Sequence, residues 1–579
     1  MKLLDLPVES IHEALLYLPL KGIHACLLTC GVLYELINNS TEIAYNIELE
    51  LAGVDENPCS PALSGLSVSD KLELLRERER RWLSLAPAEH RVPRCVVPIP
   101  GPTGAELYDL LDGGMLVTDW NPDLPPSPIQ YLPIPPAPGP DNWKTLFSGK
   151  SVIEFATDGH DLLVVYTSTP IAGMRLQIEA HFLHFPAGRP HPDAAVPTIQ
   201  LFTAVHHFDI SHEVVDSTVV LLCGHDEFSE LQIYDWVSGC PIIEPVRFPL
   251  DTELAGLLDQ HTIVLVVPHS MELRVVPLPQ DSTPCAVPLD ESAFVSFSLP
   301  RLRSGWAADP SSFKSVGESG FRSRRSPPSR PRDPATPAGN PPFLIRDATA
   351  LMVIAYDVAV NDRDYLADYY SEVEVQLLLV IRRNSLLEAF IEARTDHRHS
   401  VPWHLWGLRS ARYLEGLDIG IRGVAGQRLA SIPPDSQNSP AQISILDFNP
   451  GTYKMLRRAC ATSAAARPSK LTSTRTLGDL SWDDKGCRFL LGTDRDASQV
   501  NLQLVCAMRG LLQLPAPISI LATIFAEPSV ALSSELAYLK IISAQNYAFA
   551  RVHLMNSTVA GVLENDEGDV SAADFLYLG

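Results

Sequence analysis

The chain has 579 residues and a formal net charge of −24, from 45 Lys and Arg against 69 Asp and Glu. This length allows two to four domains, and so acidic a balance argues against nucleic acid or an anionic membrane surface as the main partner. Hydrophobic residues make up 46% and charged residues 20%, as in folded globular proteins, while 49 prolines and 33 glycines favour many short elements over long helices.

Residues 1–45 are predicted to form a small helical module. Apolar residues recur there at every third or fourth position, which is the spacing of one face of a helix. Pro19 with Gly22 ends the first helix, and Gly31 separates the second from the third, so three short helices are expected. The periodic positions are Val8, Ile11, Leu15, Leu18, Ile23, Cys26, Leu27, Cys30, Leu33, Leu36 and Ile37.

A fourth helix is predicted at about 69–85, within a helical linker that covers residues 46–92. Asp70 and Glu73 resemble a capping box at its start. Its Glu and Arg residues stand at spacings that allow ion pairs along the helix. The stripe expected to be buried consists of Leu72, Leu75, Trp82 and Leu83.

Past Pro93 the apolar period changes from that of a helix to that of a strand, and short apolar runs alternate with turns about every ten residues. More than a dozen such runs occur without helices long enough to serve as crossovers, which argues against a parallel α/β sheet. The fold class is therefore predicted as multidomain α+β: a helical module followed by an all-β domain. Its first part is expected at residues 93–300 and its second part at 343–579.

Residues 301–342 are predicted to be a disordered insertion, because they are rich in Pro, Ser and Arg and poor in apolar side chains. A shorter stretch at about 457–475 has a similar composition. Two interpretations stay open for both stretches: solvated loops between strands, or a docking or phosphorylation segment. Ser326-Pro327 beside Arg324 and Arg325 would suit the second.

The N-terminal pattern resembles the F-box, a trihelical module of about 40 residues, although Leu33 stands where many F-boxes carry a bulky aromatic residue. The resemblance covers residues 4–43. It implies docking on the Skp-type adaptor of a cullin-based ubiquitin ligase, and through that adaptor on the cullin. The residues that it assigns to this module, some facing the adaptor and others holding the helices together, are Leu6, Pro7, Ile11, Leu15, Leu18, Pro19 and Ile23. The alternative is a helical cap that packs on the β-domain.

The β-rich remainder looks like a divergent β-propeller. Residues 231–239 (LQIYDWVSG) are similar to the third strand and turn of a WD-type blade, although no strict 40-residue repeat is present. Asp574-Phe575 is expected to begin a last strand that closes the ring. The whole layout, with Trp403 and Trp406 in the β-region, resembles F-box proteins of mushroom-forming fungi. Those two Trp side chains are expected either to pack between blades or to anchor a ligand.

No catalytic, metal or cofactor site is predicted. The ten cysteines contain no CxxC pair, and the densest group of possible ligands, His206 to Glu213, has no second cluster to complete a metal site. The first ten residues lack the apolar core of a signal peptide and no apolar run is long enough to cross a membrane, so a cytoplasmic or nuclear location without a membrane partner is expected.

These observations favour a non-catalytic substrate-recognition subunit of a ubiquitin ligase. The helical module would bind the Skp-type adaptor, and the β-domain would bind a protein substrate whose identity the sequence does not reveal. The second hypothesis is a propeller scaffold with a helical cap and no link to a ligase. The third is a propeller hydrolase, because propellers also host enzymes.

Overall fold

The computed structural model describes the helical region almost continuously and most strands of the β-domain. The described residues are 6–58, 60–85, 94–99, 107–111, 114–118, 126–133, 143–157, 161–172, 175–205, 208–224, 228–249, 254–279, 286–316, 320–321, 342–346, 350–360, 374–415, 423–432, 440–449, 452, 480–483, 486–490, 501–505, 525, 538–547, 549–555, 558–564 and 570–577.

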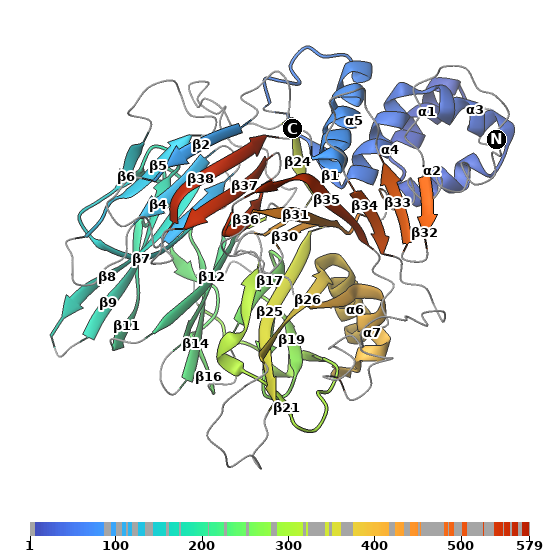
Figure 1. The fold of residues 1–579 in the computed structure, drawn as a ribbon. Helices are drawn as coiled ribbons and strands as arrows, with labels where there is room; N and C mark the ends of the chain where they lie inside the picture. The colour runs from blue at the N-terminus through green and yellow to red at the C-terminus, as the bar shows by residue number, and fades with distance from the viewer. Residues whose placement is uncertain are drawn as a thin grey trace.

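The N-terminal region contains the predicted helices and one more (Figure 1). The additional helix begins after Ser40, whose hydroxyl accepts a hydrogen bond from the backbone N–H of Ile43. The last helix starts slightly earlier than expected, so its capping box consists of Ser67 and Asp70 and not of Asp70 and Glu73. The five helices are α1 (Val8–Leu16), α2 (Leu20–Leu27), α3 (Gly31–Asn39), α4 (Thr41–Ala52) and α5 (Val68–Ser84).

The β-domain is a propeller, as the sequence predicted, and the structure shows that it has seven blades. Four of its seven sheets follow one another along the chain as antiparallel blades. Their strands are β3 (Leu107–Leu111), β4 (Gly114–Thr118), β5 (Ile129–Pro133) and β6 (Lys144–Phe147) in blade 1; β7 (Ser151–Thr157), β8 (Leu162–Ile171), β9 (Arg175–His184), β10 (Arg189–Pro190) and β11 (Thr198–Val205) in blade 2; β12 (Asp209–Val215), β13 (Thr218–Gly224), β14 (Phe228–Asp235), β15 (Cys240–Pro241) and β16 (Val246–Pro249) in blade 3; β17 (Leu254–Asp259), β18 (Thr262–Val267), β19 (Glu272–Pro277) and β20 (Val295–Ser298) in blade 4.

The last three blades are less regular because insertions interrupt them. Blade 6 carries three strands, inserted between β31 and β35 in the sequence, on its outer edge. The strands are β21 (Trp306–Ala308), β22 (Lys314–Val316), β25 (Leu351–Val360), β26 (Glu374–Arg382) and β28 (Ala411–Glu415) in blade 5; β29 (Val424–Ala425), β30 (Arg428–Ser431), β31 (Ala441–Asp447), β35 (Tyr538–Tyr547), β34 (Asn501–Val505), β33 (Gly486–Leu490) and β32 (Leu480–Asp483) in blade 6; β36 (Arg551–Leu554), β37 (Thr558–Glu564), β38 (Val570–Tyr577) and β2 (Arg94–Pro98) in blade 7.

The two ends of the propeller sequence meet in blade 7. Strand β2, which precedes blade 1 in the chain, pairs antiparallel with β38, from Arg94 opposite Leu576 to Pro98 opposite Ala572. The prediction of a last strand around Asp574-Phe575 that closes the ring is therefore confirmed. A closed ring leaves no unpaired edge between the first and the last blade.

One prediction about the middle of the β-domain was wrong in its first part. The segment predicted to be disordered begins with ordered strands: β21 and β22 pair with β25, and β23 (Gly320–Phe321) pairs in parallel with β12. Apolar residues such as Trp306 and Val316 supply the strand pattern, which the surrounding Ser and Arg residues hid. Residues 322–341 and the stretch 457–475 lie outside the described residues.

Blade 5 also contains two helices where only strands were expected. They are α6 (Arg383–Thr395) and α7 (Trp403–Ser410), inserted between β26 and β28, and the strand β27 (Ser400–Val401) between them pairs with β20 of blade 4. Trp403 and Trp406 are 5% and 1% exposed and pack edge to face with each other in the core. Of the two interpretations of this pair, the structure supports packing.

Gly561 in β37 is expected to be essential for the packing of blade 7. A Cβ atom at this position would lie 2.2 Å from the ring of Phe549, which is buried. Gly561→Ala should lower the free energy of unfolding by about 1–3 kcal/mol in denaturant titration. Gly31→Ala is the matched control, because nothing lies within 4 Å of a Cβ there, and it should cost nothing. Equal effects of the two substitutions would contradict this packing.

Candidate functional site

The helical module α1–α3 has its own small core. Ile11, Leu15 and Ile23, three of the residues that the F-box resemblance assigned to the module, are 4%, 3% and 3% exposed. They pack with Leu33 and Ile37 of α3 and with residues of α4. These three side chains therefore hold the helices together and are not available to a partner.

The other assigned residues are more accessible. Pro7, Leu18 and Pro19 are exposed, and Leu6 is half-buried against the core of the module. Pro7 and Pro19 precede the first residues of α1 and α2, where proline costs no helical hydrogen bond. Leu18, which is 37% exposed, lies between the two helices and presents part of its side chain to solvent.

Sequence reasoning missed several exposed apolar side chains on the same three helices. Tyr17 and Leu28 are 81% and 89% exposed. In the part of the chain that the structure describes, 14 large apolar residues are exposed, and six of them fall within residues 8–34: Val8, Tyr17, Leu18, Leu28, Val32 and Tyr34. Such a concentration indicates an interaction surface. The sequence could have revealed these side chains, because they are apolar residues that lie outside the buried stripe of each helix. We call these six residues the apolar face of the module.

Helices α4 and α5 connect this module to the propeller. Ile43 of α4 belongs to the core of the module, whereas Tyr45 and Leu49 on another side of α4 pack with Leu72 and Leu75 of α5 in a second core. The burial of Leu72, Leu75 and Trp82 confirms the predicted stripe on α5. Because α4 contributes to both cores, the module is packed against α5 rather than tethered to it by a flexible linker.

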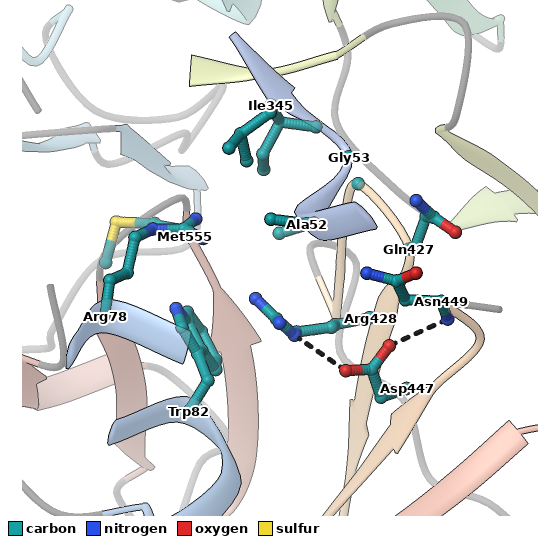
Figure 2. A pocket seen from close by; sticks show the side chains of 13 residues that line it. Ala52, Gly53, Arg78, Trp82, Ile345, Gln427, Arg428, Asp447, Asn449 and Met555 are labelled. Atoms are coloured by element: carbon teal, nitrogen blue, oxygen red, sulfur yellow. Dashed lines mark hydrogen bonds and ion pairs between the residues drawn. The ribbon is translucent and has the colours of Figure 1, made fainter. Parts of the chain in front are cut away.

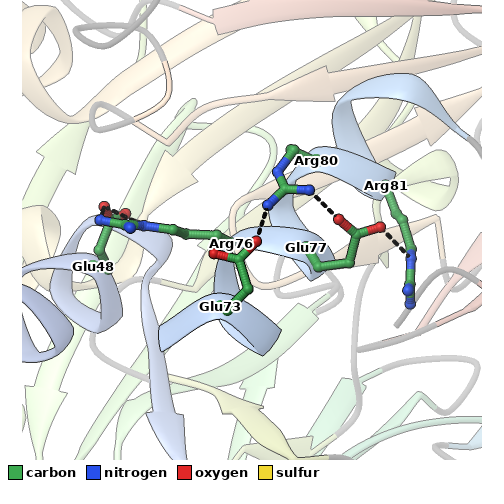
Figure 3. Close-up of polar contacts among 6 residues, drawn as sticks. All are labelled: Glu48, Glu73, Arg76, Glu77, Arg80 and Arg81. Atoms are coloured by element: carbon green, nitrogen blue, oxygen red, sulfur yellow. Dashed lines mark hydrogen bonds and ion pairs between the residues drawn. The ribbon is translucent and has the colours of Figure 1, made fainter. Parts of the chain in front are cut away.

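Polar contacts reinforce the packing between α4 and α5. Arg76 of α5 donates from Nη2 to Glu48 Oε1 of α4 over 3.1 Å (Figure 3). Along α5 itself, Arg80 pairs with Glu73 and Glu77, and Arg81 Nε lies 3.1 Å from Glu77 Oε1. These are exposed pairs, each worth less than about 1 kcal/mol. Their opposite charges compensate one another along the exposed side of α5.

The joint between α5 and the propeller is built around Arg428 of β30 (Figure 2). Its guanidinium group pairs with Glu79 of α5, and its Nε lies 3.2 Å from Asp447 Oδ2 of β31. The same group stands 4.8 Å from the ring centre of Trp82, which adds a cation–π contact. Trp82 belongs to the core formed by blades 6 and 7, so both apolar and charged contacts fix α5 to the ring.

The electrostatics of this joint depend on having both arginines present. Burial by itself would raise the pKa of Glu79, but Arg428 and Arg78 hold the pKa of this carboxyl group below its ordinary value. Burial is also the largest influence on Asp447 and raises its pKa, against the opposing effect of Arg428. Glu79 is therefore the carboxylate that anchors α5 at neutral pH.

A second connection lies beside the first. Strand β1 (Val54–Glu56), between α4 and α5, pairs antiparallel with β24 (Phe343–Ile345), just before blade 5 continues. Arg346 donates from Nη2 to Asp55 Oδ1 over 2.8 Å and also pairs with Glu50. The helical region is thus attached to the propeller by a small sheet as well as by the Arg428 joint.

Only part of the predicted group from His206 to Glu213 lies in the described residues. His206 and His207 of the predicted cluster lie outside them, and Glu213 is bound at 2.9 Å by Arg383 Nη1. Glu213 also accepts the backbone N–H of Leu257, so the pair connects blades 3, 4 and 5. No group of three or more His, Cys, Asp or Glu side chains suited to a metal is present in the part of the chain described.

His181 of β9 is a structural residue. Its two ring nitrogens lie 2.9 Å from the hydroxyls of Thr167 and Thr198 on the neighbouring strands β8 and β11. Burial, with a smaller contribution from Lys150, lowers the pKa of His181 to about 4. The imidazole is therefore neutral at pH 7 and connects three strands of blade 2.

Comparisons with known proteins give no family for this chain. No family model matches it, and no curated protein matches either. Solved structures that it resembles include the WD40 domain of coronin from Toxoplasma gondii, at 9% identity and a TM-score of 0.29 over 79% of this chain and 88% of that chain. Another is an uncharacterized protein from Listeria monocytogenes, at 8% identity and a TM-score of 0.26 over 50% of this chain and 95% of that chain. A third is prolyl oligopeptidase B from Galerina marginata, at 9% identity and a TM-score of 0.23 over 47% of this chain and 37% of that chain.

These values are too low to carry an argument about function, and the chain spans little more than a third of the prolyl oligopeptidase. The propeller is established by the seven sheets themselves and by their closure through β2. None of the helices in the described part of the chain has the length and apolarity needed to cross a bilayer.

Glu79→Gln is expected to loosen the joint. It removes the carboxylate that Arg428 and Arg78 share, and leaving buried charge under-compensated should cost about 2–3 kcal/mol of unfolding free energy. Hydrogen exchange in α5 should also accelerate. Glu73→Gln is the matched control on the same helix, because Glu73 and Arg80 are 64% and 57% exposed. Its cost should stay below about 1 kcal/mol. Comparable losses in the two variants would contradict the assigned role of Glu79.

The stability of blade 2 should fall in mild acid. The pKa of His181 is about 4 in the folded chain, below the ordinary 6.5, so the unfolded chain binds more protons between these values. The contribution of His181 is then fully present above about pH 6.5 and is lost as the pH falls towards 4, by up to about 3 kcal/mol. Urea unfolding of His181→Gln should show a shallower pH dependence over this range. An unchanged slope would show that another group titrates.

Proposed function

We propose that this chain is the substrate-recognition subunit of a cullin-based ubiquitin ligase. The observation that carries the proposal is the apolar face of the module: six exposed apolar side chains on α1 and α3 and in the turns after α1 and α2, in a segment whose sequence resembles an F-box. Three short helices cannot bury all their apolar surface alone, so a partner surface of matching chemistry is expected. In this proposal that partner is a Skp-type adaptor, which in turn binds the cullin.

The buried and exposed residues of the module take different roles in the proposal. Leu18, Tyr17 and Leu28 would contact the adaptor, with Pro7 and Pro19 fixing the starts of α1 and α2. Ile11, Leu15 and Ile23 would act indirectly, by holding the helices in the arrangement that exposes the apolar face. The adaptor would thus cover side chains that stand in water in the isolated chain.

The propeller would bind the protein substrate. Two of its buried polar groups, the Glu213–Arg383 pair and His181, are engaged in structural contacts. We therefore propose that this chain is not an enzyme. The transfer of ubiquitin would be carried out by partner enzymes, and this chain would raise the effective concentration of the substrate near them. A cytoplasmic or nuclear location follows from the same proposal.

The alternative function, a propeller scaffold with a helical cap, predicts a different packing of the helical module. A cap would bury the apolar face of α1–α3 against the β-domain. Among the side chains that the structure describes, the core of the module consists of residues between Leu6 and Ile47. Helix α4 shares a core with α5 and β24, and α5 packs through Trp82 on blades 6 and 7, so these two helices supply the apolar contacts to the propeller.

Binding of purified full-length protein to a purified Skp-type adaptor tests the proposal. Leu18→Asp should weaken the complex at least tenfold in calorimetry, because a carboxylate would be buried in an apolar contact without a partner, at about 1.4 kcal/mol or more. The fold should be unaffected, since Leu18 is 37% exposed.

The matched control is Ile391→Asp, the same change at an apolar residue on α6 that is 57% exposed. Its affinity for the adaptor should equal that of the unmodified protein. Two results would refute the proposal: no binding by the unmodified chain, or equal loss of affinity in the two variants.

A further inference from the structure

A small cavity lies within the joint between α5 and the propeller (Figure 2). Its volume is about 20 Å³, and it is bordered by the end of α4, by α5 and by the edge of blade 6. A space of this size accommodates one water molecule, and any larger ligand is excluded. Among the side chains that line it are Arg78, Trp82, Arg428 and Asp447.

The indole nitrogen of Trp82 is the group in this cavity that requires a partner. Trp82 is 1% exposed, and within the described residues its Nε1 has no hydrogen-bond acceptor. An indole N–H can only donate, and a buried donor without an acceptor is costly. By contrast, the indole groups of Trp236 and Trp406 donate to backbone carbonyls at 2.7 and 3.1 Å. The cavity beside Trp82 is where an equivalent acceptor would fit.

The charges around the cavity favour a neutral occupant. Arg78 and Arg428 bring two guanidinium groups, and Glu79 and Asp447 bring two carboxyl groups. They form a chain of pairs, in which Arg78 and Arg428 both pair with Glu79 and Arg428 also pairs with Asp447. Because these charges balance, an anion such as chloride would gain no net attraction. A water molecule is neutral, accepts from the indole N–H and can donate in turn to acceptors in a polar lining.

We propose that this cavity is a hydration site, in which one ordered water molecule accepts a hydrogen bond from Trp82 Nε1. The water is then part of the joint, because it satisfies the buried indole N–H of Trp82 on the face of α5 that contacts the ring. This inference is independent of any partner of the helical module.

A crystal structure of the full chain, grown with bromide in place of chloride, tests the proposal directly. The expected result is a water-sized density peak about 2.7–3.2 Å from Trp82 Nε1 without an anomalous bromine signal. A cavity without density, or one occupied by bromide, would overturn it.

Indole resonances give a second test in solution, using the full chain labelled with ¹⁵N-tryptophan. The Trp82 resonance is assigned by its loss in Trp82→Phe, and that of Trp406 by its loss in Trp406→Phe. The Trp82 N–H should show a cross-relaxation peak to a long-lived water. The Trp406 N–H, which is bound to the carbonyl of Ser298, should show none. A Trp82 resonance without that peak would contradict the proposal.

Discussion

The arrangement of this protein depends on one side chain in particular, Arg428. It accounts for the position of α5, because it binds Glu79 of that helix, Asp447 of its own blade and the face of Trp82 at once. Each of these contacts would be weak or costly alone: an isolated buried arginine has to be compensated, and a buried carboxylate prefers to be neutral. Together they hold a charged helix against a β-sheet core.

The joint between α5 and the propeller lies beside the strands that close the ring. Strand β2, which follows α5 in sequence, completes blade 7, while Trp82 of α5 packs into the core of blades 6 and 7. The helical region is therefore attached beside the point where the ring closes. Helices α4 and α5 connect this attachment to the module, because α4 packs with α5 in one apolar core and with α1–α3 in another. The apolar face of the module is consequently held in a defined orientation relative to the propeller.

Some buried polar groups of the propeller connect elements that lie far apart in the sequence. Glu213 and Arg383 join three blades, and His181 joins three strands. The surface feature without a structural explanation is apolar, on α1–α3. A partner that bound there would remove exposed tyrosine and aliphatic side chains from water, which is favourable.

The sequence by itself determined the elements whose signal is local. The three-to-four-residue period identified α1–α3 and α5, and the change of period after Pro93 marked the start of the β-domain. The turn at residues 235–239 formed as its residues require, with Asp235 Oδ1 accepting the backbone N–H of Val237 at 3.0 Å and Gly239 at a φ of +74°. These features depend on neighbours within one turn or one hairpin, so a single sequence is enough to predict them.

The tertiary structure alone decided the long-range features. The sequence did not indicate that Arg428 would meet Glu79 across 349 positions, or that β1 would pair with β24. It named Ile11, Leu15 and Ile23 together with Leu18, although only the last has an exposed side chain, because a helical pattern does not say which apolar residues neighbouring helices will cover. Helices α6 and α7 were missed for a related reason: their residues are buried by the blades that they contact, and that burial exists only once the ring has formed.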